Sequence, residues 1–216
     1  MNKSELLPQF CNLLDPIILE DGYRYLKSHE KYQKKLKGLR LWLLPNITYW
    51  ASSKYCMVSP RLSVHVDAIE DVLSSHRGLK VDRHFPTLTI LSDNLKDPKY
   101  WTINNDHDLS HQSNDILNAV KSSYLPLLDS WSSPKEVALS TIKNEQQVFH
   151  SELHRLCVLF AYIAAFNDSE AISKVVQSVD FDSISRSRNQ QDPYYRGILA
   201  SMRSEVPEIG EIGIDI

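Results

Sequence analysis

The chain has 216 residues, of which 42% are hydrophobic and 24% are charged, and its formal net charge at pH 7 is −3. This length suits one globular domain, and ten prolines and six glycines supply no low-complexity linker. A slightly acidic chain is not expected to be a general nucleic-acid-binding protein, which needs an excess of Lys and Arg.

Three cysteines lie far apart and none belongs to a C-x-x-C pair, so neither a disulfide framework nor a thiolate zinc site is indicated. A reduced, cytoplasmic protein is the simplest interpretation. The N-terminus lacks the apolar core of a signal peptide. The most apolar run, at 156–166, has about half the length of a membrane span and predicts a buried helix.

The first expected element is a helix that is capped by Ser4 and ends near Glu20, because its apolar residues follow helical spacing. Pro16 should kink this helix or divide it. From Tyr23 the spacing of apolar residues changes to two, which predicts a basic hairpin and then a strand with three leucines on one face. These leucines are Leu39, Leu41 and Leu43.

Residues 61–66 alternate in the same way and predict a further strand, with Ser63 and His65 on the face turned to solvent. A helix should follow directly. Asp67 is expected to cap it, and Glu70 completes an Asp-x-x-Glu variant of the capping box. His65 and Asp67 form a His-x-Asp pair, which we interpret as structural because Asp67 is committed to the cap.

Two short strands are expected at 87–91 and 100–103. From Asp108 the chain is predicted to be nearly all helical, and Pro126 should bend the last turn of the first helical segment. The predicted helical segments are 108–131, a helix opened by Ser133 and Pro134, 146–167, a helix opened by Asp168 and Ser169, and 193–203.

This order of elements predicts an α+β fold. We expect an N-terminal helix and a small, mostly antiparallel sheet, followed by a C-terminal bundle of about four to five helices. The whole chain, 1–216, is interpreted as a single globular domain. Its α+β part should cover 1–105, and its helical part should cover 106–216 and include an acidic C-terminal tail.

His107 and His111 stand in the run His-Asp-Leu-Ser-His, which differs from the zinc-binding pattern H-E-x-x-H by one methylene group. A zinc site needs this histidine face to line a cleft with a third ligand. Helical spacing instead places both histidines about half a turn from the apolar stripe. We therefore expect a polar, solvent-facing helix start with Asp108 in its first turn, and metal binding is the alternative.

A second pair, His150 and His154, is also spaced by four residues and lies at the edge of its apolar stripe. Histidines in this position usually pack the ring and hydrogen-bond with its tip. The remaining interpretations are a metal site, a proton switch or a partner contact. A metal-dependent hydrolase that uses one of the two His-x-x-x-His pairs is therefore our alternative function, although no other catalytic or phosphate-binding motif occurs.

Positive charge is concentrated in residues 24–40, which hold seven Lys or Arg and one acid, Glu30. Tyrosines alternate with these cations, as in some strands that bind nucleic acid. A lysine-protected edge strand explains the pattern more simply, and a protein partner is a further interpretation. This hairpin is the only candidate site for nucleic acid.

The last residues, from Ser204 to the C-terminus, reverse the pattern, since they alternate acids with isoleucines. Two glycines and a proline argue against a helix there. Such a segment is expected to dock, either on its own chain or in the groove of a partner. Its acidic candidates for partner contact are Glu205, Glu208, Glu211 and Asp215.

The segment ELLPQFCNLLDPIILEDGYRYLKSHEKYQKKLKGLRLWLL, with the later strand and helix RLSVHVDAIEDVL, resembles small bacterial α+β proteins. Some of these are immunity proteins encoded beside polymorphic toxins. The resemblance is one of layout, covers about the first 75 residues, and brings no functional residue of the family to a position in this chain.

The resemblance implies a stoichiometric protein that binds one toxin domain and needs no cofactor. Its contacts would be aromatic anchors and complementary charge. Besides the four acidic tail residues, the candidates for partner contact are His107, Asp108, His111 and two tryptophans expected to be exposed on the early strands, Trp42 and Trp50.

Overall fold

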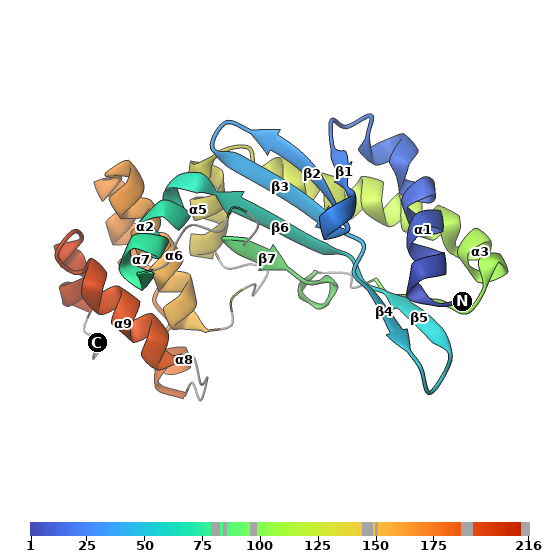
Figure 1. Ribbon diagram of the computed structural model, residues 1–216. Coiled ribbons are helices and arrows are strands. Elements are labelled where there is room, and N and C mark those ends of the chain that lie inside the picture. Colours follow the sequence, from blue (N-terminus) through green and yellow to red (C-terminus); the bar gives the residue numbers. More distant parts are fainter. Residues whose placement is uncertain are drawn as a thin grey trace. The chain divides into compact units, whose positions relative to one another are not determined.

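The computed structural model describes residues 1–78, 83, 86–95, 99–143, 149, 151–186 and 192–212. It confirms the α+β fold: an N-terminal helix is followed by antiparallel strands and then by helices (Figure 1). The chain forms two compact units, which are described in turn. Unit 1 contains residues 1–64 and 89–132, and unit 2 contains 65–88 and 133–216. Each unit combines two separate stretches of the chain, so neither unit ends at residue 105, where the expected α+β part ends.

Unit 1 begins with helix α1 (Lys3–Ile18), which buries Leu6, Phe10, Leu14 and Ile18. Asn2 caps the helix through a capping box with Glu5, so the expected cap at Ser4 is wrong by two residues. The Tyr32 hydroxyl lies 2.7 Å from Asp15 Oδ1 and 3.1 Å from the Cys11 carbonyl oxygen. This buried contact ties α1 to the sheet.

The larger sheet has five strands in the order β1-β2-β3-β6-β7 within the described residues. Their bounds are Arg24–Leu26, Lys31–Leu36, Leu39–Leu44, Arg61–Val66 and Leu88–Ile90, and a 3-10 turn (Lys27–His29) joins the first two. β2 pairs antiparallel with β1 and with β3. Leu39, Leu41 and Leu43 are all buried, as expected.

The smaller sheet consists of β4 (Ile47–Trp50), β5 (Tyr55–Val58) and β8 (Trp101–Ile103), in the order β4-β5-β8. Both pairings are antiparallel. The chain passes from the larger sheet to the smaller one at Pro45 and returns at Pro60, where the missing N–H groups interrupt the strands. Asn46, at φ 45°, makes the turn, and its Nδ2 donates to the Ser59 carbonyl oxygen over 2.9 Å.

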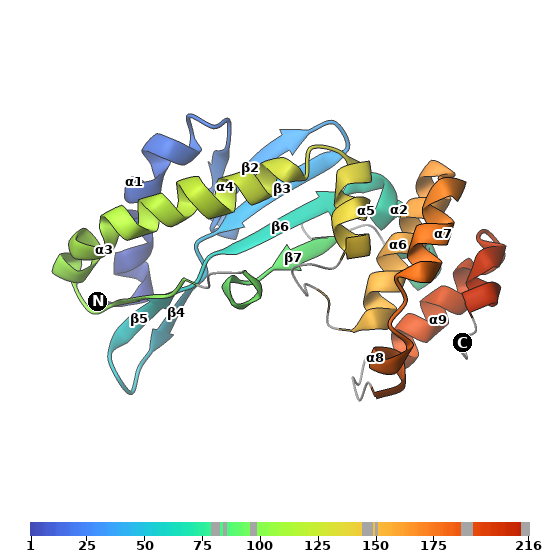
Figure 2. The same cartoon turned by 180° about the vertical axis from the view of Figure 1, so that it is seen from behind.

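Helices α3 (Asp106–Ala119) and α4 (Leu125–Ser130) are joined by a π-helical turn, Val120–Tyr124. They follow one another end to end: α4 runs across the larger sheet, and α3 extends beyond it toward the smaller sheet, where it contacts β8 (Figure 2). The expected bend at Pro126 takes the form of this wider turn, which lies just before the proline. Pro126 itself stands in the first turn of α4, where the backbone needs no N–H donor.

Trp42 is only 1% exposed, so the expectation that it lies on the surface is wrong. Its strand, β3, is the central strand of the larger sheet, and both faces are covered. Lys31 Nζ lies 3.3 Å from the centroid of the Trp42 ring, and Trp42 Nε1 donates to Gln33 Oε1 over 3.2 Å. Lys31 is itself buried.

Unit 2 contains seven described helical elements, with α6 (Glu152–Phe166) in contact with most of the others. The others are α2 (Asp67–Arg77), α5 (Pro134–Lys143), α7 (Ser169–Gln177), α8 (Phe181–Arg186), α9 (Asp192–Met202) and the 3-10 helix Pro207–Ile212. α6 is buried almost throughout, as expected for its apolar run. Within the described residues, no helix is both long and apolar enough to span a bilayer.

A buried ion pair fixes the start of α6. Arg155 is 2% exposed and donates to Glu152 from Nε over 2.8 Å and also from Nη2. Its Nη2 donates to the Ser178 carbonyl oxygen over 2.7 Å, just after α7. These bonds satisfy a charge that would otherwise be costly to bury.

The expected capping box at the start of α2 is wrong. Val66 is the N-cap residue and gives no side-chain cap, while Glu70 is 4% exposed. Burial raises the pKa of Glu70, although a hydrogen bond from Thr87 opposes the shift. Ser63 and His65 are also buried rather than turned to solvent, and His65 Nε2 lies 3.2 Å from Asp67 Oδ1. The sequence does not reveal that both faces of β6 are covered.

We expect Trp42→Ala to lower the free energy of unfolding by about 3–5 kcal/mol, because it removes a large buried side chain and uncovers Lys31. Trp50→Ala is the matched control and should cost less than about 1 kcal/mol, since Trp50 is 46% exposed. Urea denaturation followed by circular dichroism measures both values. Equal losses for the two variants would contradict the packing of Trp42.

Candidate protein-binding surface

The smaller sheet of unit 1 has one covered face and one open face. Ile103, Cys56 and Val58 are buried on the covered face, with α1 in contact with β4 and α3 in contact with β8. The strand register puts five uncharged side chains on the opposite face, which we call the outer face. They are Thr48, Trp50, Tyr55, Met57 and Thr102.

Trp50 is the main aromatic residue of the outer face. Its ring stacks on that of Tyr55 with centroids 6.3 Å apart and planes at 23°. Thr48 and Thr102 are exposed, while Tyr55 and Met57 are half-buried. The β4–β5 hairpin projects from the rest of unit 1 (Figure 1). Exposed aromatic residues on an uncharged surface are typical anchors in protein–protein interfaces.

The start of α3 holds three of the residues predicted to bind a partner. The Asn105 side chain caps the helix by accepting from Asp108 N–H over 3.1 Å. Asp108 Oδ2 accepts from both the backbone and the side-chain nitrogen of Asn104, each over 2.8 Å. The bonds from Asn104, backbone first, lower the pKa of Asp108. Asp108 therefore serves the start of its own helix.

His107 and His111 are exposed on α3, as expected from helical spacing. Their rings lie 6.4 Å apart with planes at 10°. Within the described residues, no three or more His, Cys, Asp or Glu side chains come together as a potential metal site. The pair is exposed and can contact a partner, and the described part of the chain places no third ligand beside it for a zinc site.

The second histidine pair is only partly described, because His150 lies outside the described residues. The His154 ring stacks on Tyr195 with centroids 4.8 Å apart and meets the edge of Phe149 at 5.4 Å. Its backbone N–H donates to Ser151 Oγ over 3.2 Å. His154 therefore packs its ring at the edge of the helix stripe, as predicted.

The C-terminal tail docks on its own chain as far as it is described. Val206 and Ile209 are 2% and 1% exposed. Glu205 Oε1 lies 3.4 Å from His76 Nε2, and His76 Nδ1 lies 3.0 Å from Ser201 Oγ. Glu205 is thus partnered within unit 2. Asp215 and the side chains of Glu208 and Glu211 lie outside the described parts.

Two of the seven basic residues in segment 24–40 are engaged inside unit 1, while Arg24, Lys27, Lys35 and Lys37 are exposed. Lys31 is buried on Trp42. Lys34 Nζ lies 3.2 Å from both Asp21 Oδ2 and Asp129 Oδ1. These contacts use two of the segment's charges inside unit 1, so fewer of its cations are available for phosphate contacts than the sequence suggests.

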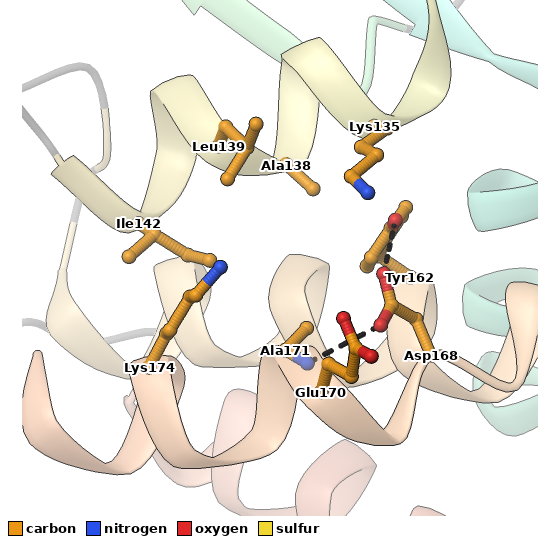
Figure 3. Close-up of a pocket in the computed structure, with 9 residues that line it drawn as sticks. All are labelled: Lys135, Ala138, Leu139, Ile142, Tyr162, Asp168, Glu170, Ala171 and Lys174. Atoms are coloured by element: carbon orange, nitrogen blue, oxygen red, sulfur yellow. Dashed lines mark hydrogen bonds between the residues drawn. The ribbon is translucent and has the colours of Figure 1, made fainter.

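A shallow pocket lies between α5, α6 and α7 in unit 2 (Figure 3). Tyr162 donates to Asp168 Oδ2 over 2.8 Å, and Ala171 N–H donates to Asp168 Oδ1 over 3.3 Å. The bond from Tyr162 lowers the pKa of Asp168. The remaining charged groups at the rim are of both signs. They are Lys135, Glu170 and Lys174. The pocket therefore shows no clear preference for a ligand charge.

Comparison with known proteins gives no family, because no family model, no curated protein and no solved structure matches the chain. The outer face is the best-defined candidate site because it combines an exposed tryptophan with uncharged neighbours on the same strands. Of its residues, only Trp50 was predicted. The available signal was the pair of short β-rich runs, Ile-Thr-Tyr-Trp and Tyr-Cys-Met-Val, on either side of a four-residue turn.

Substitution of Asp108 tests whether it stabilises the start of α3. We expect Asp108→Ala to have a lower Tm than the wild type at pH 7. A carboxyl with a lowered pKa in the folded state contributes stability above its unfolded pKa, about 3.9, and loses it as pH falls through the folded pKa. The Tm difference should therefore shrink toward pH 2. Thermal unfolding across this range measures it, with His107→Ala as the control.

Proposed function

We propose that the chain is an immunity protein, an antitoxin-like inhibitor that neutralises a cognate bacterial toxin by forming a stoichiometric complex. The outer face of the smaller sheet makes the central contact. The observation that carries this proposal is Trp50, which is 46% exposed on a projecting hairpin; the other strand residues that the register places on its face are uncharged.

The chemistry of the outer face supports protein recognition. Trp and Tyr bury large areas on binding while few rotatable bonds are fixed, and Trp is over-represented among residues that dominate binding energy. Thr48 and Thr102 add hydroxyl groups at the sides of this anchor. A toxin surface with an apolar pocket for the Trp50 ring is the partner that fits.

The choice of a toxin as the partner rests on the layout of residues 1–75. The N-terminal helix and the strands that follow it resemble bacterial immunity proteins, and four of the five outer-face residues lie in this segment. The net charge of −3 favours approach to a basic toxin domain, such as a nuclease. The three cysteines are free and buried, which suits a cytoplasmic protein.

The product of the gene adjacent to this one is the partner to test. We expect it to be toxic when expressed alone, to be neutralised by co-expression with this chain, and to co-purify with it in a fixed ratio. Trp50→Ala should weaken the complex by about thirtyfold, because loss of a central aromatic anchor costs about 2 kcal/mol or more. Isothermal titration calorimetry measures the change in Kd.

Tyr194→Ala is the matched control, since Tyr194 is 47% exposed and lies in unit 2. It should leave the Kd within about twofold of the wild-type value. The proposed function is overturned if the neighbouring gene's product is not toxic and forms no complex with this chain. If a tight complex forms and Trp50→Ala leaves its Kd unchanged, the outer face is not the contact surface.

A further inference from the structure

We propose that the free edge of β4 accepts an extended segment of the toxin as a fourth strand of the smaller sheet. This inference rests on the proposed function and specifies how the partner is held. Addition of a strand supplies affinity through backbone hydrogen bonds, and alternating side chains supply specificity.

The hydrogen-bond pattern of β4 identifies the groups on this edge. Ser59 N–H donates to the Asn46 carbonyl oxygen over 3.2 Å, so these facing residues form a hydrogen-bonded pair. Bonded and non-bonded pairs alternate along an antiparallel ladder. Two residues further on, Thr48 and Met57 are therefore bonded to each other, and Tyr49 is not bonded to β5. The N–H and C=O of Tyr49 point away from β5, toward the free edge.

The opposite edge of the same sheet shows the same alternation. Thr102 faces Met57 in the non-bonded register, so the Thr102 carbonyl points outward from β8. There it accepts a hydrogen bond from Gln112 Nε2 of α3 over 3.0 Å. The β8 edge is thus partly closed by its own chain, whereas β4 pairs with no strand beyond β5 within the described residues.

β4 also lacks the usual protection of an edge strand. Natural edges carry lysine, proline or a bulge that prevents pairing with another chain. Ile47–Trp50 contains neither lysine nor proline, and Thr48, Tyr49 and Trp50 are all exposed. The sequence of this edge favours pairing with another strand.

The composition of the hairpin defines the segment that would bind. Lys54, at the hairpin tip, is the only charged residue between Ile47 and Val58. The occupant that fits is an extended stretch rich in β-branched or aromatic residues, whose one charged residue is an acid beside the hairpin tip. Its side chains would alternate between Trp50 on the outer face and Tyr49 on the other.

Tyr49→Pro removes the outward N–H without removing a bond to β5. Proline is tolerated on an edge strand when its nitrogen faces away from the neighbouring strand. We expect this variant to keep the wild-type circular dichroism spectrum and to bind the adjacent gene's product about tenfold or more weakly, because one backbone bond is lost and a carbonyl is left unpaired. Tyr49→Thr keeps the N–H and should bind within about threefold of wild type.

Amide hydrogen exchange gives a second measurement on the wild-type chain. The Tyr49 amide should exchange readily in the free protein and become protected in the complex, whereas the Thr48 amide should be protected in both. Absence of any complex with the wild-type chain would overturn the proposed function and this inference together. A complex in which Tyr49→Pro binds as tightly as Tyr49→Thr, or in which the Tyr49 amide stays unprotected, would overturn the strand addition alone.

Discussion

The contact between Asn46 and Ser59 is the point on which the arrangement of unit 1 depends. Asn46 Nδ2 donates to the Ser59 carbonyl oxygen over 2.9 Å and lies 2.7 Å from Ser59 Oγ. Pro45 and Pro60 end the ladder of the larger sheet on both strands, because neither has an N–H group. The Ser59 N–H also donates to the Asn46 carbonyl oxygen over 3.2 Å, so backbone and side-chain bonds together hold the two strands just beyond the prolines. With these bonds, the chain continues as a second hairpin in a new sheet.

The position of a tryptophan in these strands decides its role more than its local sequence does. Trp42 and Trp50 both follow apolar or aromatic residues in short strands. Trp42 lies in a central strand with both faces covered and is 1% exposed, whereas Trp50 lies in an edge strand beyond the Asn46 turn and is 46% exposed. Burial of Trp42 stabilises the fold, and exposure of Trp50 leaves a large aromatic surface for binding.

The spacing of apolar residues was sufficient to predict the fold class, the strand that carries Leu39, Leu41 and Leu43, and the exposure of His107 and His111. It could not show the second face of a strand, since alternation is a property of one strand and burial depends on what packs against it. For this reason Ser63 and His65 were misplaced. Strand order and hydrogen-bond alternation are equally non-local, so the open edge at Tyr49 had no signal in the sequence.

An exposed, uncharged edge is a cost that folded proteins normally avoid, since any extended chain can pair with it. The smaller sheet limits this risk on one side, where Gln112 of α3 bonds to the β8 edge. On the other side, the exposed side chain of Trp50 and the Tyr49 backbone groups that face away from β5, unpaired with any described strand, occur in the same strand. Neither the exposed Trp50 ring nor the edge at Tyr49 stabilises the fold, so stability does not explain why both occur in one four-residue strand. A partner that covers the aromatic ring and pairs with the edge accounts for both at once.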